Sequence, residues 1–100
     1  NFGNSCLQLN AEVKSSVLLL DDDYVNYLYF TELIEEGGHR LLRAVSLGQA
    51  LFKLNTNPSI RLLVITSTFA ARFNYKIGSY IRQKYPSLPQ IAIWETVTFC

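Results

Sequence analysis

Short apolar runs and longer periodic stretches alternate along the chain, and this pattern predicts strands and helices in turn. Strands are expected at residues 17–21, 40–45, 61–65 and 91–94, and helices at about 24–36, 47–54 and 71–84. In the helical stretches apolar residues recur every three or four positions, as on one face of a helix. The β-α-β-α-β-α-β order predicts an α/β fold, a parallel sheet with right-handed crossovers and helices on both faces.

The helix expected at 24–36 is apolar over an unusually wide arc. Its main stripe consists of Tyr27, Phe30, Leu33 and Ile34. Leu28 and Tyr29 lie outside that stripe, so either both sides of the helix are packed or one side meets a partner. Gly37 and Gly38 predict the end of the helix, because glycine readily takes the left-handed conformation of a C-cap. Ser46 is expected to cap the next helix.

Three consecutive acids, Asp21, Asp22 and Asp23, follow the first strand. In open α/β sheets ligands bind at the carboxyl ends of the strands. Like charges side by side are costly unless water, a cation or a basic side chain offsets them. One interpretation is therefore a cation site. The other is a helix N-cap, where Asp is favoured and acids suit the positive end of the helix dipole. The two interpretations are compatible.

Composition limits the classes of function that need to be considered. The chain has 100 residues, 49% of them hydrophobic and 17% charged, which suits one domain with a buried core. Its formal net charge is +1 without a basic stripe, so we expect no nucleic-acid partner. No apolar run approaches a membrane span. Residues 1–14 are polar and are expected to form a linker or tail. Cys6 and Cys100 make no metal motif and are expected to be separate thiols.

Several stretches carry a resemblance to a known family. Residues 17–26, VLLLDDDYVN, give a hydrophobic strand, paired acids and a helix with an early Asn. Residues 81–93, IRQKYPSLPQIAI, give a helix, a turn and a strand. With the helix end at 35–39, they resemble the receiver domains of response regulators and hybrid histidine kinases. The resemblance covers about residues 16–94. It implies a flavodoxin-like (CheY-like) fold at residues 15–100, truncated to about four strands and three helices and ending after the fourth strand.

The resemblance implies a specific set of site residues. In the family, paired acids hold Mg²⁺, an Asp ending the third strand accepts a phosphoryl group, a Ser or Thr ends the fourth strand and a Lys ends the fifth. Asp21 and Asp22 match the acid pair here. The phosphoacceptor position falls on Thr66 and the hydroxyl position on Trp94. The Lys has no counterpart.

These departures change the chemistry that the resemblance implies. A Thr hydroxyl must be deprotonated by a neighbouring base before it attacks, and no His or Lys is placed to do so. Ser67 and Thr68 are alternative acceptors, but local backbone contacts are the better account of their hydroxyls. With only Asp21 and Asp22 as carboxylate ligands, we expect Mg²⁺ to bind weakly and no other cofactor to bind. Trp94 either fills the space of the phosphoryl group or is a core aromatic with its N–H at the rim.

The resulting expectation is a degenerate receiver domain in phosphorelay signal transduction. It would be a non-phosphorylatable regulatory or protein-docking module in the cytoplasm, not an enzyme, with a histidine kinase or an output domain as partner. The alternative is a flavodoxin-like small-ligand-binding domain that uses the cleft at the strand ends. A fourth strand left at the sheet edge would expose apolar residues and unpaired backbone groups, so we also expect a homodimer through that edge.

Overall fold

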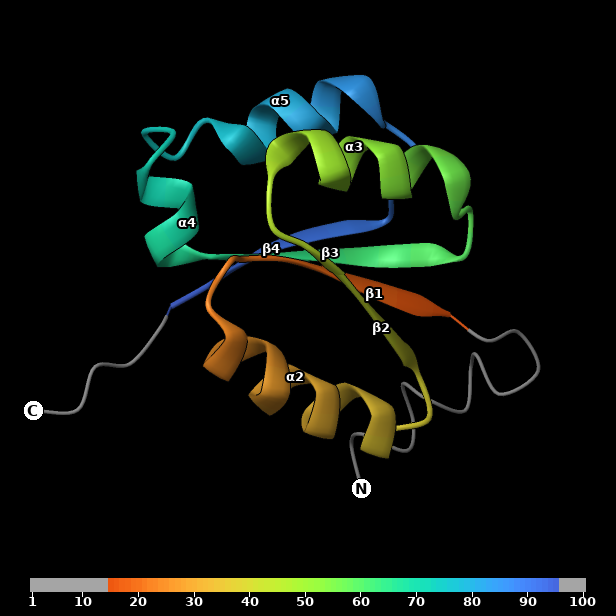
Figure 1. Ribbon diagram of the computed structural model, residues 1–100. Coiled ribbons are helices and arrows are strands. Elements are labelled where there is room, and N and C mark those ends of the chain that lie inside the picture. Colours follow the sequence, from red (N-terminus) through yellow and green to blue (C-terminus); the bar gives the residue numbers. More distant parts are fainter. Residues whose placement is uncertain (1–14, 96–100) are drawn as a thin grey trace, which may run out of the picture.

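Four short apolar strands form one parallel sheet in the computed structural model, which describes residues 15–95 (Figure 1). The strands are β1 (Ser16–Leu20), β2 (Arg40–Ala44), β3 (Ile60–Thr66) and β4 (Gln90–Trp94). Their spatial order is β2-β1-β3-β4, which is the first four positions of the flavodoxin-like order. The α/β fold and the parallel sheet predicted from the sequence pattern are thereby confirmed.

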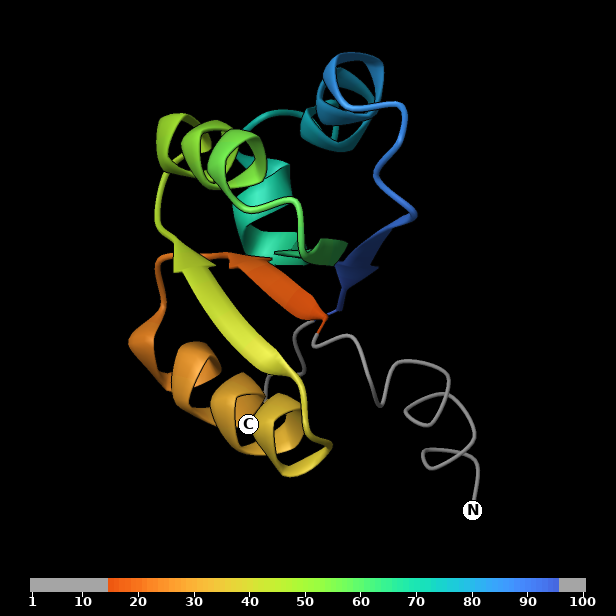
Figure 2. The ribbon, with the colours of Figure 1, turned by 90° about the vertical axis from the view of Figure 1, so that its right-hand side faces the viewer.

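Helices cover both faces of the sheet, so the molecule has three layers (Figures 1 and 2). The helix α2 (Tyr24–Glu36) lies on one face. The helices α3 (Leu47–Thr56) and α5 (Ile77–Lys84) lie on the other, together with the short helix α4 (Ser67–Ala71). The connection from β1 to β2 crosses the sheet in the direction opposite to the later connections, so right-handed crossovers place α2 on the face opposite α3 and α5.

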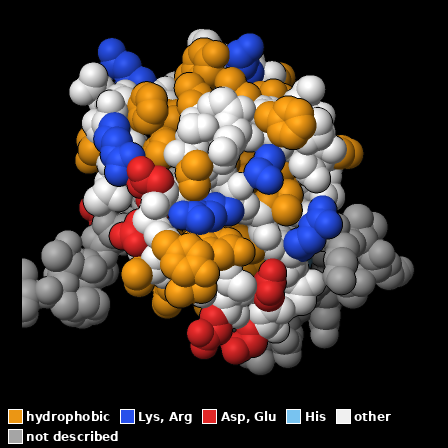
Figure 3. Space-filling view, in the orientation of Figure 1, with side chains coloured by type: hydrophobic (Ala, Val, Ile, Leu, Met, Phe, Trp, Pro, Cys, Tyr) orange, Lys and Arg blue, Asp and Glu red, His pale blue; other side chains and the backbone are white. Residues whose placement is uncertain are grey.

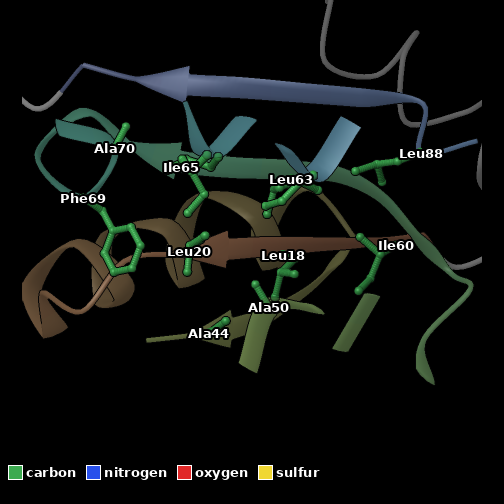
Figure 4. Close-up of a cluster of buried hydrophobic side chains, with 12 residues drawn as sticks. Leu18, Leu20, Ala44, Ala50, Ile60, Leu63, Ile65, Phe69, Ala70 and Leu88 are labelled. Carbon is green, nitrogen blue, oxygen red and sulfur yellow. The ribbon is translucent and has the colours of Figure 1, made fainter. Parts of the chain in front are cut away.

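The strand β1 is buried along its whole length and divides the core into two clusters. Leu18 and Leu20 point into the larger cluster beneath α3, α4 and α5 (Figure 4). Val17 and Leu19 point into the smaller cluster, where Phe30 of α2 packs on them. A central parallel strand is buried on both faces, which explains why its sequence is a continuous apolar run. Each buried Leu contributes about 1.5–3 kcal/mol relative to exposure.

Local sequence signals place the helix ends as expected. The Asp23 carboxylate accepts a hydrogen bond from the Val25 N–H at 2.9 Å and caps α2. The Ser46 hydroxyl accepts one from the Gln49 N–H at 3.2 Å and caps α3. Gly38 has φ of +89° just after α2, a conformation that side chains with a Cβ rarely adopt. The helix termini in turn set the lengths of the loops that join them to the strands.

The expected third helix at 71–84 differs from the structure. Two helices, α4 and α5, occupy this region, so the sheet carries four helices rather than three. Between them Asn74 and Tyr75 have positive φ values of 53° and 58°. Left-handed residues end a right-handed helix, and Asn tolerates this conformation better than most residues. The apolar spacing from Phe73 to Ile81 therefore comes from a turn followed by a helix.

The strand β4 lies at one edge of the sheet and, among residues 15–95, pairs only with β3. Ile93 and Trp94 near its end are 48% and 39% exposed. The expected tail at 1–14 and the two cysteines lie outside the described residues. In the described part of the chain, no helix has both the length and the apolar character needed to span a bilayer.

Candidate functional site

Asp21 is buried at the carboxyl end of β1, where it accepts two hydrogen bonds. The residue is only 1% exposed. The Thr66 hydroxyl donates to one carboxylate oxygen at 2.7 Å, and the Asn26 amide donates to the other at 2.9 Å. The parallel register of β1 and β3 brings Asp21 and Thr66 together, because Leu20 pairs with Ile65 immediately before them. Both oxygens of this carboxylate are therefore engaged within the chain.

Asp22 is exposed and forms a two-pronged ion pair with Arg72. The two guanidinium nitrogens lie 2.7 Å and 3.0 Å from the two carboxylate oxygens. The hydrogen bond from Arg72 is the main cause that lowers the pKa of the Asp22 carboxyl group from its ordinary value. The same bond raises the pKa of the Arg72 guanidinium. Planar guanidinium and carboxylate groups match in this geometry, which adds orientation to the charge attraction.

A second arginine contributes positive charge near these acids. Arg43, on β2, places its guanidinium carbon 5.0 Å from the ring centre of Tyr27 and 5.5 Å from that of Tyr24. Its charge adds a smaller lowering of the pKa of Asp22. Stacking on two rings partly desolvates the guanidinium, which strengthens the cation–π attraction. The strand-end acids are thus balanced by arginines of the same chain.

Thr66, which stands at the phosphoacceptor position implied by the resemblance, is closed off from solvent. The residue is 0% exposed, and its hydroxyl proton is directed at Asp21. A small phosphodonor in solution cannot reach a fully buried oxygen without opening of the site. The neighbouring Ser67 and Thr68 begin α4 instead of ending the strand.

Trp94 pairs with Thr66 in the β3–β4 register, yet its ring packs toward α2. The indole ring meets Phe30 edge-to-face, with ring centres 5.1 Å apart. It also lies 6.3 Å from the ring of Tyr29. These are spacings at which aromatic pairs attract. Trp94 therefore covers part of the sheet beside α2, and 39% of the residue stays exposed.

The two acids that match the family's metal-binding pair are thus committed to other groups. Within residues 15–95, no group of three or more His, Cys, Asp or Glu side chains is arranged to hold a metal ion. A Mg²⁺ ion at Asp21 and Asp22 would have to displace Arg72 and compete with Asn26. Such competition fits the expectation of weak binding, which stays a prediction.

Sequence reasoning did not identify two of these partners. Asn26 was noted only as part of the resemblance, although an Asn five residues after a buried Asp on a helix start can reach back to it. Arg72 carried no signal at all. It lies in the turn after α4, and the sequence pattern placed residue 72 inside a continuous helix. The correct position of that turn was needed to bring Arg72 to Asp22.

The Thr66–Asp21 hydrogen bond should contribute measurably to stability. Thr66→Val removes the hydroxyl at nearly constant volume and leaves a buried carboxylate oxygen without its donor. We expect the free energy of unfolding to fall by about 1.5–3 kcal/mol, as for hydrogen bonds to charged groups, measured by urea denaturation near neutral pH. The control Thr68→Val, at an exposed position, should change stability by no more than about 0.5 kcal/mol. Equal losses in the two variants would contradict this role for Thr66.

Arg72 should control the titration of Asp22. Because the folded-state pKa of Asp22 is lowered, the ion pair stabilises the fold above the ordinary pKa, and this contribution is lost as the pH falls through the folded-state pKa. In Arg72→Ala, a carboxyl-detected NMR titration should find the pKa of Asp22 shifted back up toward its ordinary value. The control Arg61→Ala should leave it low. The Arg72 variant should also bind Mg²⁺ at lower metal concentrations than the wild type, and unchanged titrations would refute the pairing.

The comparisons with known proteins found no relative of this chain. No family model matches the sequence, and neither the curated proteins nor the solved structures give a match. The α/β fold and the geometry of the strand-end acids rest on the structure itself. The resemblance to receiver domains stays a prediction from the sequence.

Proposed function

We propose that this chain is a degenerate receiver-like domain that serves phosphorelay signalling as a regulatory or docking module without being phosphorylated. The observation that carries the proposal is the engagement of Asp21 and Asp22 by side chains of the same chain. In the family that the sequence resembles, these acids hold Mg²⁺ for transfer of a phosphoryl group to a third carboxylate. Here the position that the resemblance assigns to that carboxylate falls on Thr66, whose side chain is buried.

The electrostatics of the site support the same proposal. Phosphoryl transfer depends on cations that neutralise the charge developing on the transferred group. Arg72 already places a positive charge on Asp22 and joins the turn after α4 to the loop after β1. A cation built into the chain removes the need for a metal and holds both segments in one arrangement. A domain of this kind presents a constant surface to its partners, because it has no phosphoryl group to respond to.

The proposed partners are other proteins of a signalling pathway. A histidine kinase or an output domain in the cytoplasm would bind the domain, and the domain would catalyse no reaction of its own. The wide apolar arc of α2 is consistent with a docking role, because Val25, Leu28 and Tyr29 are 71%, 49% and 53% exposed. Exposed apolar side chains gathered on one helix mark interaction sites more often than scattered ones do.

The absence of phosphorylation is directly testable. Incubation with acetyl phosphate and Mg²⁺ should leave the intact mass unchanged, because Thr66 is buried and lacks an activating base. Beryllofluoride with Mg²⁺ should likewise leave the amide NMR spectrum unchanged around Asp21 and Thr66. An active receiver domain in the same reactions serves as the positive control. A stoichiometric phosphoryl adduct on this chain would overturn the proposal, and its loss in Thr66→Ala would locate it.

We also infer that a second copy pairs with the free edge of β4. The supporting observation is that β4 has a strand partner on one side only within residues 15–95, with Ile93 half exposed beside it. Open edges with apolar side chains favour pairing with another strand. Sedimentation at about 1 M ionic strength, where charge-dependent contacts are screened, should show a dimer that Ile93→Lys dissociates, because a charged side chain blocks edge pairing. The control Val45→Lys, at an exposed position away from β4, should keep the dimer; a monomer at every concentration of wild type would exclude it.

A further inference from the structure

Within residues 15–95, acidic and basic residues occupy largely separate parts of the sequence. Within residues 15–95, every acid other than Glu95 lies between residues 21 and 36, and every Lys and Arg lies between residues 40 and 84. The fold carries this separation into space, because α2 lies on one face of the sheet and α3 and α5 lie on the other. In Figure 3 the acidic side chains lie at the lower end and along the left side, and most basic side chains lie above the lower end. A net charge near zero therefore conceals an uneven distribution of charge, although Arg43 stacks on two tyrosines of α2 and Arg72 pairs with Asp22.

The outward side of α2 combines apolar and acidic residues, and we call it the acidic helix surface. Its members are Val25, Leu28, Tyr29, Glu32, Leu33 and Glu36. The apolar residues lie mainly in the first half of the helix and the glutamates in the second. Among the described residues, neither glutamate forms an ion pair. Acids at a helix C-terminus face the negative end of the dipole, so they lower the stability of the isolated helix. Local folding does not explain their placement.

The opposite side of the molecule carries a complementary surface, which we call the basic helix surface. A groove of about 220 Å³ opens at the start of α5 and has room for one large apolar side chain. Its lining residues are Leu47, Phe73, Asn74, Lys76, Ile77 and Tyr80. Lys84 follows at the end of α5, where its ammonium group lies 5.9 Å from the ring centre of Tyr80. The groove, with Lys76 among its lining residues, thus lies in the first half of this surface, and Lys84 lies in the second half.

The two surfaces have the same order of features and the same direction. In Figure 1, α2 and α5 run in the same sense across the sheet, as helices of a parallel α/β fold do. A second copy displaced across the layers, without rotation, would place its α2 parallel to α5 of the first. The apolar first half of the acidic helix surface would then meet the groove of the basic helix surface. Glu32 and Glu36 would lie against the end of α5 that carries Lys84. Both charge and apolar character match in this arrangement.

We propose that the acidic helix surface of one copy binds the basic helix surface of the next, so that the chain associates head to tail. A second copy is the occupant because the same chain carries both halves of the complementarity. The contact is heterologous, and its two surfaces lie on opposite sides of the molecule, so it does not close into a two-fold dimer but continues as an open stack. It is distinct from pairing through β4 and does not depend on the proposed signalling role.

Salt and charge reversal test the attraction. Sedimentation of the wild type should show concentration-dependent growth beyond a dimer at about 0.1 M ionic strength and less growth at about 1 M, where the Debye length falls from about 10 Å to about 3 Å. Two variants reverse one surface each: E32K/E36K and K76E/K84E. Each variant alone should associate at least roughly tenfold more weakly, because like charges would face each other. Circular dichroism checks that both variants are folded.

Mixing the two variants provides the decisive measurement. Equal amounts of E32K/E36K and K76E/K84E should form larger species that neither variant forms alone. In one contact the two reversed surfaces attract each other, and in the other contact the two intact surfaces do. Arg61→Glu, a charge reversal near the start of β3 in an exposed residue that belongs to neither helix surface, should associate like the wild type. A wild type that does not grow beyond a dimer, single variants that associate as strongly as the wild type, or a mixture no larger than its components would each overturn the proposal.

Discussion

The buried carboxylate of Asp21 is the constraint on which the strand-end site depends. A carboxylate with almost no exposure is costly unless hydrogen bonds compensate for the lost water. Thr66 and Asn26 supply those bonds from β3 and α2, so one side chain ties the central strand to its neighbouring strand and to the helix that follows it. The same demand determines what the site can do. A hydroxyl that satisfies Asp21 is held in the interior, where it cannot take part in chemistry with groups in solution.

Arg72 determines the electrostatic character of the site in a similar way. Adjacent acids at the end of a strand need positive charge nearby, and either a metal ion or a basic side chain can provide it. In this chain the basic side chain is in place, with two hydrogen bonds to Asp22 and a position 5.2 Å from the ring centre of Phe69. Arg43 adds to the field from the other side. The charge of Asp22 is therefore balanced within the polypeptide, which supports the proposed docking role.

The layered architecture has a second consequence, for the surface. Right-handed crossovers send α2 to one face of the sheet and α3 and α5 to the other. Because every acid within residues 15–95 except Glu95 lies in the loop after β1 or in α2, the crossovers convert a division along the sequence into a division in space. Each side also carries exposed apolar residues, among them Tyr29 on one and Tyr80 on the other. The helices α2 and α5 thus each pack one side on the sheet and present the other side for the proposed interaction.

The sequence by itself determined the elements of this fold and their order. Continuous apolar runs marked strands such as β1 and β3. Asp23 and Ser46 cap helices through hydrogen bonds to residues two or three positions later, and Gly38 takes a left-handed conformation. These local interactions were enough to place the ends of α2 and the start of α3. It also placed Asp21 and Thr66 at strand ends. Only the tertiary structure decided their partners, because the bonds to Asp21 span 45 and 5 residues and the pairing of Asp22 with Arg72 spans 50. Arg72 directly follows α4, in the turn that continues through the left-handed residues Asn74 and Tyr75, and does not lie inside the expected helix. The periodicity of apolar residues indicates which side of a helix or strand is buried. It does not indicate which side chain, distant in the sequence, will form an ion pair with a given acid.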